Sequence, residues 1–315
     1  MTGPLAWVVG AGGLVGRRVV AELERCGWTV RGARVPWEDE AAALRALLEQ
    51  ADRFAVDRGG RRWALVWCAG AGVVATGQDA LDAEERVLGG LLDHLDRLPG
   101  ADEGTLFLCS SAGGLYAGAD GAPFTEDTTP APLVPYGRAK LRAEDRAALH
   151  ARRTGTRVVL GRIANVYGPG QRLGKPQGLV SQLCLADARG TPLPVYVSLD
   201  TIRDYVYVDD LAAMVRACLD LAAHGPPGTV TVKVLASGVP ATVGHLVGEA
   251  RRVFHRPLRT ITVPGGTGQV LDLRLRSVRW TEVDVLARTP LAAGLAATAE
   301  DVRRRVVAGT PLDAA

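Results

Sequence analysis

The chain has 315 residues, of which 47% are hydrophobic and 23% are charged, so it can bury a sizeable core and does not resemble a disordered chain. The formal net charge is only +3, and the one basic triplet, Arg303–Arg305, is expected on the solvated face of a helix near the C-terminus. A nucleic-acid-binding protein usually concentrates its positive charge, so that class of function is not expected. Many Ala and Arg residues with few Lys residues suggest a bacterial source with GC-rich DNA.

The cysteines and histidines form no metal or disulfide pattern. Five cysteines occur without a CxxC pair, which predicts free thiols in a reducing cytoplasm. Five histidines occur without HxH or HExxH spacing, so no metal site is expected. The sequence has no run of 18 apolar residues and no charged region before its first apolar run, so we expect neither a membrane span nor a signal peptide.

Strand-like and helix-like periods alternate through the first half of the chain. Strands are predicted at 6–9, 28–33, 63–67, 105–109 and 157–160, and helices at 14–25, 38–50, 78–98 and 136–153. This alternation is typical of a parallel sheet covered by helices. The third strand that such sheets usually have is not obvious between 34 and 63, where Val35–Trp37 is its only candidate.

The second half of the chain is less regular. Glycine and proline dominate 167–197, and the later elements are short. Strands are predicted at 205–208, 229–234 and 260–263, with helices from 210, near 243–253 and at 298–307. The predicted fold class is α/β, a Rossmann-type doubly wound parallel sheet with a smaller, interleaved α/β C-terminal substrate lobe.

A GxxGxxG pattern lies directly between the first predicted strand and the first predicted helix. Glycines at such a turn let backbone N–H groups and the positive end of the helix approach a pyrophosphate. The cofactor-binding residues predicted at this turn are Gly10, Gly12, Gly13, Leu14, Val15 and Gly16. With this turn at its start, the larger part of the interleaved fold is predicted to be an NAD(P)-binding domain of residues 1–165 and 204–235. Residues 166–203 and 236–315 are predicted to form the substrate-binding lobe.

Arg34 follows the second predicted strand, where a dinucleotide fold usually offers a carboxylate to the adenosine ribose. A guanidinium can instead clasp a 2′-phosphate, which favours NADP. The alternative is that the same planar cation stacks on the adenine and is indifferent to the 2′ group. The predicted cofactor is therefore NAD or NADP.

Lys140 is one of three lysines in the chain and completes a YxxxK pattern with Tyr136. On a helix, positions i and i+4 share a face, and a lysine cation beside a phenol stabilises the phenolate. Tyr136 is thus a candidate proton acceptor near neutral pH. Ser110 and Ser111 end a buried predicted strand, where a hydroxyl can bind the same substrate oxygen. The simpler alternative is that both serines cap the turn that follows.

Six segments carry a resemblance to a known family: VGAGGLVG, CAGAG, SSAGGLY, YGRAK, RIANVYGPGQ and RDYVYVDDLA. Their order and spacing resemble the extended short-chain dehydrogenases/reductases, in particular the nucleotide-sugar epimerase/dehydratase branch, of which UDP-galactose 4-epimerase is the best-known member. The resemblance implies that Tyr136, Lys140 and Ser111 are catalytic, with Ser110 as the alternate hydroxyl because an extra glycine shifts the register. The further cofactor contacts that it implies are Cys68, Ala69, Gly70, Tyr136 and Lys140. The substrate contacts that it implies are Ser111, Asn165, Leu179, Tyr196 and Arg203.

Two departures from the family pattern bear on the implied reaction. Dehydratases of this family carry an Asp-Glu pair immediately after the catalytic hydroxyl, whereas this chain has Ala112 and Gly113, so 4,6-dehydration is not expected. Gln269 lies where relatives have an arginine three residues before an aspartate, which weakens the usual clamp on the diphosphate. Arg274 or Arg276 could take over that contact.

The resemblance implies a nucleotide-sugar epimerase, acting at C4 through a transient keto-sugar with hydride transfer to and from a bound nicotinamide cofactor. The alternatives are an NADPH-dependent reductase of a nucleotide keto-sugar, which Arg34 favours, and a non-catalytic dinucleotide-binding sensor. The implied substrate is a nucleotide-diphosphate sugar. Relatives dimerise through helices that correspond here to 81–98 and 141–153, so a homodimer is expected. The leucine stripe on the first of these helices could equally be ordinary core; it comprises Leu88, Leu91, Leu92 and Leu95.

Overall fold

The computed structural model describes residues 3–32, 34–70, 76–174, 178–255, 259–262 and 270–310. The chain forms two compact units. The first comprises Met1–Gly118, Thr129–Ile163 and Ala212–Lys233, and the second comprises Ala119–Thr128, Ala164–Leu211 and Val234–Ala315. None of the helices in the described ranges combines the length and the apolar character needed to cross a membrane.

The core of the first unit is a six-stranded sheet with the strand order β2-β1-β3-β4-β5-β9. The strands are β1 (Leu5–Val9), β2 (Thr29–Arg31), β3 (Trp63–Trp67), β4 (Gly104–Ser111), β5 (Arg157–Ile163) and β9 (Val230–Leu235). Neighbours from β2 to β5 pair in parallel. β1 and β3 are buried along their whole length, as expected for apolar strands that are covered on both faces. The predicted α/β fold of the Rossmann type is confirmed.

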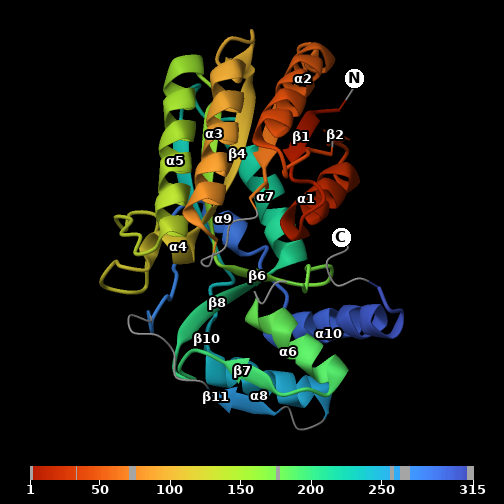
Figure 1. Ribbon diagram of the computed structural model, residues 1–315. Helices are drawn as coiled ribbons and strands as arrows, with labels where there is room; N and C mark the ends of the chain where they lie inside the picture. Colours follow the sequence, from red (N-terminus) through yellow and green to blue (C-terminus); the bar gives the residue numbers. More distant parts are fainter. Residues whose placement is uncertain are drawn as a thin grey trace. The chain divides into compact units, whose positions relative to one another are not determined.

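Helices cover this sheet on both faces. They are α1 (Leu14–Arg25), α2 (Glu40–Arg58), α3 (Gln78–Leu95), α4 (Ala112–Tyr116), α5 (Pro135–Thr154) and α7 (Val208–Ala222). α3 and α5 lie side by side, as Figure 1 shows. The leucine stripe of α3 is buried in the core of the single chain, where it packs with α2 and the sheet. Of the two uses predicted for this stripe, the core is the one observed.

The segment between β2 and β3 contains no strand among its described residues. Val35 accepts a hydrogen bond from the amide of Trp37, and Pro36 accepts one from the amide of Asp39, so the chain turns here. Proline also lacks the N–H group that a sheet ladder needs. The ring of Trp37 meets that of Trp67 edge-on, with 6.1 Å between the centroids. The candidate strand at Val35–Trp37 is therefore wrong, and β2 is the edge of the sheet.

The second unit contains short strands and four helices within the described ranges. Its strands are β6 (Asn165–Tyr167), β7 (Leu193–Val195), β8 (Ile202–Tyr207), β10 (Pro240–Thr242) and β11 (Thr260–Thr262), and its helices are α6 (Leu179–Arg189), α8 (Val243–Phe254), α9 (Thr281–Asp284) and α10 (Leu291–Val307). β10, β8 and β6 form one sheet, and β11 pairs with β7. α10 packs against α6 and α8, as Figure 1 also shows. α6 lies in the stretch that the sequence pattern left irregular.

Candidate active site

The glycine-rich turn after β1 brings the start of α1 onto the backbone that follows β3. Gly10 has a φ of +87°, and a Cβ atom at this position would lie 2.6 Å from the amide nitrogen of Ala69. A Cβ atom at Gly16 would lie 2.2 Å from the carbonyl oxygen of Gly10. Neither position accepts a side chain, so the close approach within the first unit accounts for both glycines.

Gly12 has a different environment, because a Cβ atom there would meet nothing within 4 Å. It lies beside the N-terminus of α1, a fully described helix whose N-cap residue, Gly13, makes no side-chain cap and whose first turn has no acid. This helix end therefore offers backbone N–H groups and positive charge without competition from a side chain. The surface fits a dinucleotide pyrophosphate, and Gly12 lets it approach closely. The cofactor contacts that stay predicted here are Gly10, Gly12, Gly13, Leu14, Val15 and Gly16.

Arg34 is exposed and lies three residues beyond β2. Arg31, the last residue of that strand, pairs instead with Asp57, with Nε 3.0 Å from Oδ2. An exposed guanidinium at this edge fits either predicted use of Arg34, contact with a 2′-phosphate or stacking on the adenine.

Tyr136 and Lys140 lie one turn apart on α5, and Ser111 is the last residue of β4. The Tyr136 ring and the Ser111 hydroxyl both approach Gly114, where a Cβ atom would lie 3.1 Å from Cε1 of the ring and 3.3 Å from Oγ. The Nζ of Lys140 lies 5.7 Å from the centroid of the Tyr136 ring. The first unit therefore brings the three residues of the predicted catalytic set together.

The hydroxyls of the two serines have different partners. Ser111 accepts a hydrogen bond from the amide of Gly114 at 3.1 Å, which caps α4 and leaves the hydroxyl proton of Ser111 available for donation. Ser110 is 6% exposed and donates to Oε1 of Glu144 at 2.6 Å. Capping of the following turn, the simpler use considered for both serines, thus applies to Ser111, whereas Ser110 is part of a buried network.

That network joins β4, α4, α5 and β5 through Arg162. The guanidinium of Arg162 lies 2.8 Å from Oε2 of Glu144 and donates to the hydroxyl of Tyr116, also at 2.8 Å. Burial opposes the charge of Arg162, but hydrogen bonds and attraction from Glu144 outweigh it and raise the pKa of Arg162. Sequence reasoning missed this network, although an arginine in an apolar strand and a glutamate on the buried face of α5 were its signals.

The predicted cofactor segment after β3 lies next to Lys140. The Sγ atoms of Cys68 and Cys109 are 3.6 Å apart, and this contact together with burial raises the pKa of Cys68 well above its usual range. Ala69 is buried. Gly70 has a φ of +140°, and a Cβ atom there would lie 3.2 Å from Nζ of Lys140. The backbone of this segment therefore adjoins the ammonium group directly.

Arg203 lies in β8 of the second unit and is held by backbone carbonyl groups. Its guanidinium donates to the carbonyl oxygens of Ile202 at 2.8 Å and Val270 at 2.9 Å. Burial lowers the pKa of Arg203, and Tyr205 and Asp272 oppose this effect only in part. A half-buried guanidinium without a carboxylate in direct hydrogen-bond contact among the described residues fits an anion contact such as the predicted one.

Three further predicted substrate contacts also lie in the second unit, whereas Ser111 lies in the first. Asn165 begins β6 and donates from Nδ2 to the carbonyl oxygen of Asp204 at 3.1 Å. Leu179 is half-buried at the start of α6. Tyr196 directly follows β7 and is 59% exposed.

The region that could replace the missing clamp arginine is only partly described, because Gln269 lies outside the described residues. Arg274 forms a two-pronged contact with Asp272, with Nη2 2.7 Å from Oδ2, and this contact lowers the pKa of Asp272. The guanidinium of Arg274 is therefore engaged by a carboxylate in this structure.

A solved structure of the same fold was identified by comparison. The UDP-glucose 4-epimerase of Thermotoga maritima, determined with UDP-glucose, superposes with a TM-score of 0.80 over 96% of this chain and 99% of its own, at 23% identity. At that identity the match supports the fold.

Sequence comparisons point to the same family. The chain is 26% identical over 185 residues to a dTDP-4-dehydro-6-deoxyglucose reductase of Escherichia coli, covering 56% of each protein. It is 29% identical over 195 residues to a putative UDP-arabinose 4-epimerase of Arabidopsis thaliana, covering 55% of this chain and 44% of that protein. The chain thus spans about half the length of these curated relatives. The model of the NAD dependent epimerase/dehydratase family matches residues 6–232, more than half of the 315 residues. As the six ordered segments predicted, the chain belongs to the NAD-dependent epimerase/dehydratase family.

Proposed function

We propose that this protein is a nucleotide-sugar epimerase that acts at C4 through a transient keto-sugar. The observation that carries the proposal is the grouping of Tyr136, Lys140 and Ser111 around Gly114 and the loop after β3. The open N-terminus of α1 supports a bound dinucleotide in the same unit. The name of the Arabidopsis relative, a putative 4-epimerase, supports the reaction type.

In the proposed reaction Tyr136 takes the proton of the sugar hydroxyl while the ammonium of Lys140 stabilises the phenolate. Ser111 donates a hydrogen bond to the same substrate oxygen. A bound nicotinamide dinucleotide would supply the hydride acceptor and, on the return step, the hydride donor. Tyr136 then gives the proton back to the oxygen. Asn165, Leu179, Tyr196 and Arg203 are proposed to bind the nucleotide-diphosphate sugar.

A nucleotide keto-sugar reductase is the second candidate, and two observations favour it. The Escherichia coli relative is named a reductase, and Arg34 is exposed where an NADP phosphate would bind. Epimerase and reductase would use the same three residues. A non-catalytic sensor has no need of a lysine held next to a phenol, so the Tyr136–Lys140 pair argues against that third hypothesis.

The cofactor that the purified protein retains distinguishes the epimerase from the reductase. An epimerase regenerates its cofactor in each cycle, so we expect about one NAD per chain after denaturing release and mass spectrometry. An empty site that binds NADPH from solution would instead identify the reductase. Failure to bind either dinucleotide would contradict both proposals.

Alanine substitutions of Ser111 and Ser110 test which of the two hydroxyls is catalytic. Ser111→Ala removes both the hydroxyl beside Tyr136 and the cap of α4, so kcat is expected to fall by about 100- to 1,000-fold and stability by about 0.5–2 kcal/mol. Ser110→Ala removes a buried donor to Glu144, so stability should fall by about 1–3 kcal/mol with a smaller loss of rate. Initial rates and urea unfolding of both variants measure these effects. The opposite pattern would make Ser110 the working hydroxyl.

A cytoplasmic homodimer is part of the proposal and rests on the family resemblance. The leucines of α3 are buried within one chain, so a helical interface would use the outer faces of α3 and α5. Partly exposed ion pairs join the two helices: Arg142 pairs with Asp82 and Glu85, and Arg153 pairs with Asp96 at the end of α3. Such an interface would therefore lie next to charged side chains.

A further inference from the structure

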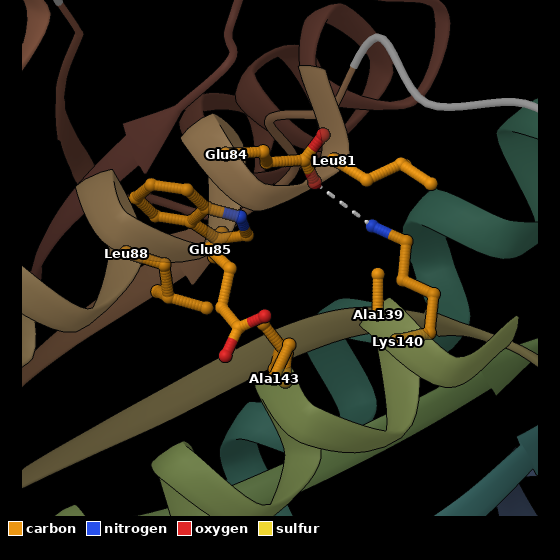
Figure 2. Close-up of a pocket in the computed structure, with 9 residues that line it drawn as sticks. Leu81, Glu84, Glu85, Leu88, Ala139, Lys140 and Ala143 are labelled. Carbon is orange, nitrogen blue, oxygen red and sulfur yellow. Dashed lines mark hydrogen bonds and ion pairs between the residues drawn. The ribbon is translucent and has the colours of Figure 1, made fainter. Parts of the chain in front are cut away.

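The ammonium of Lys140 has an ion-pair partner outside the predicted catalytic set. Glu84, on the second turn of α3, places Oε1 3.1 Å from Nζ of Lys140. Figure 2 shows the two side chains pointing toward each other across a pocket between α3 and α5. We propose that Glu84 is the residue that positions Lys140 beside the Tyr136 ring and balances its charge. This inference rests on the proposed role of Tyr136 and Lys140.

Three groups surround the ammonium of Lys140. Glu84 binds it from α3, the Tyr136 ring lies 5.7 Å away on α5, and the backbone of Gly70 lies over the ion pair. A Cβ atom at Gly70 would lie 2.8 Å from Oε1 of Glu84 and 3.2 Å from Nζ of Lys140. No side chain fits between this loop and the pair. The loop predicted to contact the cofactor therefore rests directly on the Glu84–Lys140 contact.

The pair is largely removed from water, with 12% of the Lys140 side chain and 20% of the Glu84 side chain exposed. Burial alone would lower the pKa of Lys140, but attraction to Glu84 and then to Tyr136 outweighs burial and raises it. Cys109 on β4 adds a smaller effect in the same direction. Glu84 thus keeps Lys140 protonated in a site where burial disfavours the charge.

The same carboxylate also weakens the field that Lys140 exerts on Tyr136. A lysine with a neighbouring carboxylate presents less net positive charge to the phenol than a lysine alone. Removal of the Glu84 charge should also shift proton loss at Lys140 to lower pH, because the carboxylate then no longer favours the ammonium.

Glu85 provides a matched control in the next position of the chain. It lines the same pocket, but its carboxylate binds Arg142 and turns toward Ala143 in Figure 2. Glu84→Gln and Glu85→Gln remove the same charge from the same helix turn. Only the first substitution removes a direct partner of Lys140.

The titration of Lys140 tests the proposal without any need for turnover. The chain has three lysines, so protein labelled with carbon-13 at the lysine Cε gives a simple NMR spectrum in which Lys140→Arg identifies the Lys140 signal. Glu84→Gln should move the Lys140 midpoint to lower pH, Glu85→Gln should leave it unchanged, and Glu84→Asp should restore part of the wild-type value. Equal midpoints in wild type and Glu84→Gln, or equal shifts in the two glutamine variants, would overturn the proposal.

The pH dependence of turnover gives the second readout. The basic limb of the kcat profile, where Lys140 loses its proton, should move toward acid in Glu84→Gln and stay in place in Glu85→Gln. A profile that keeps its position in Glu84→Gln while its height falls would assign Glu84 a purely structural role. If no nucleotide sugar is turned over by the wild type, the proposed function fails, whereas the lysine titration still decides whether Glu84 controls Lys140.

Discussion

Replacement of Tyr136 by phenylalanine is expected to abolish turnover while the protein still binds its dinucleotide. The substitution removes only the hydroxyl, so the ring keeps its place beside Gly114 and Lys140. Proton transfer by a positioned side chain typically contributes about 10²- to 10⁴-fold to the rate, so kcat should fall by at least about 100-fold. Initial rates with UDP-glucose and titration of NAD or NADPH by tryptophan fluorescence measure the two properties separately.

A second tyrosine serves as the control for that substitution. Tyr207 on β8 packs edge-on against Tyr167, with 5.7 Å between the ring centroids, and phenylalanine preserves this contact. Tyr207→Phe should therefore keep a kcat close to that of the wild type. Wild-type turnover in Tyr136→Phe would rule out the phenol as the proton acceptor, and the grouping with Lys140 and Ser111 would then need another explanation.

The first unit could be predicted from the sequence because its elements are defined by local patterns. β3 has the predicted bounds, since the apolar run Trp63–Trp67 is preceded by Arg61 and Arg62. α1 likewise has its predicted bounds, because the glycine turn starts it and the helical period continues to Arg25. The YxxxK spacing places Tyr136 and Lys140 one turn apart on a helix whatever the rest of the fold does.

Other features depend on packing that local patterns do not show. α6 is buried at most of its positions, so its sequence, LVSQLCLADAR, has no clear polar face to reveal a helical period. Its ends are marked by Gly178 and Gly190, both with positive φ, which are common turn residues in any irregular segment. The stretch therefore resembled a loop.

The partners of the candidate catalytic residues could not be predicted either, because they lie far from them in the sequence. Glu84 lies 56 positions from Lys140, and Ser110 lies 34 positions from Glu144. Spacing rules apply within one helix or strand, whereas these contacts join two different elements. Such a contact also bears on the prediction that names Ser111 ahead of Ser110, because Glu144 engages the Ser110 hydroxyl.

Arg162→Met is expected to lower the free energy of unfolding by about 3–5 kcal/mol, the usual effect of removing one partner from a buried ion pair. The side chains of Arg162 and Glu144 are 6% and 3% exposed. Methionine fills much of the same space but leaves the Glu144 carboxylate buried without its cation, with the Ser110 hydroxyl still donating to it. The hydroxyl of Tyr116 loses the hydrogen bond from Arg162 in the same step. Urea unfolding followed by circular dichroism measures the loss.

Two further variants test whether the loss of stability in Arg162→Met comes from the buried ion pair. Arg153→Met removes an arginine that is 52% exposed beside Asp96, so its effect should stay within about 1 kcal/mol. Arg162→Met combined with Glu144→Leu removes both buried charges, and its loss should be clearly smaller than the sum of the two single losses. If Arg162→Met were no more damaging than Arg153→Met, the buried pair would not anchor β5 to α5. Ser110, whose hydroxyl is fixed by the same carboxylate, would then have no rigid support beside Ser111.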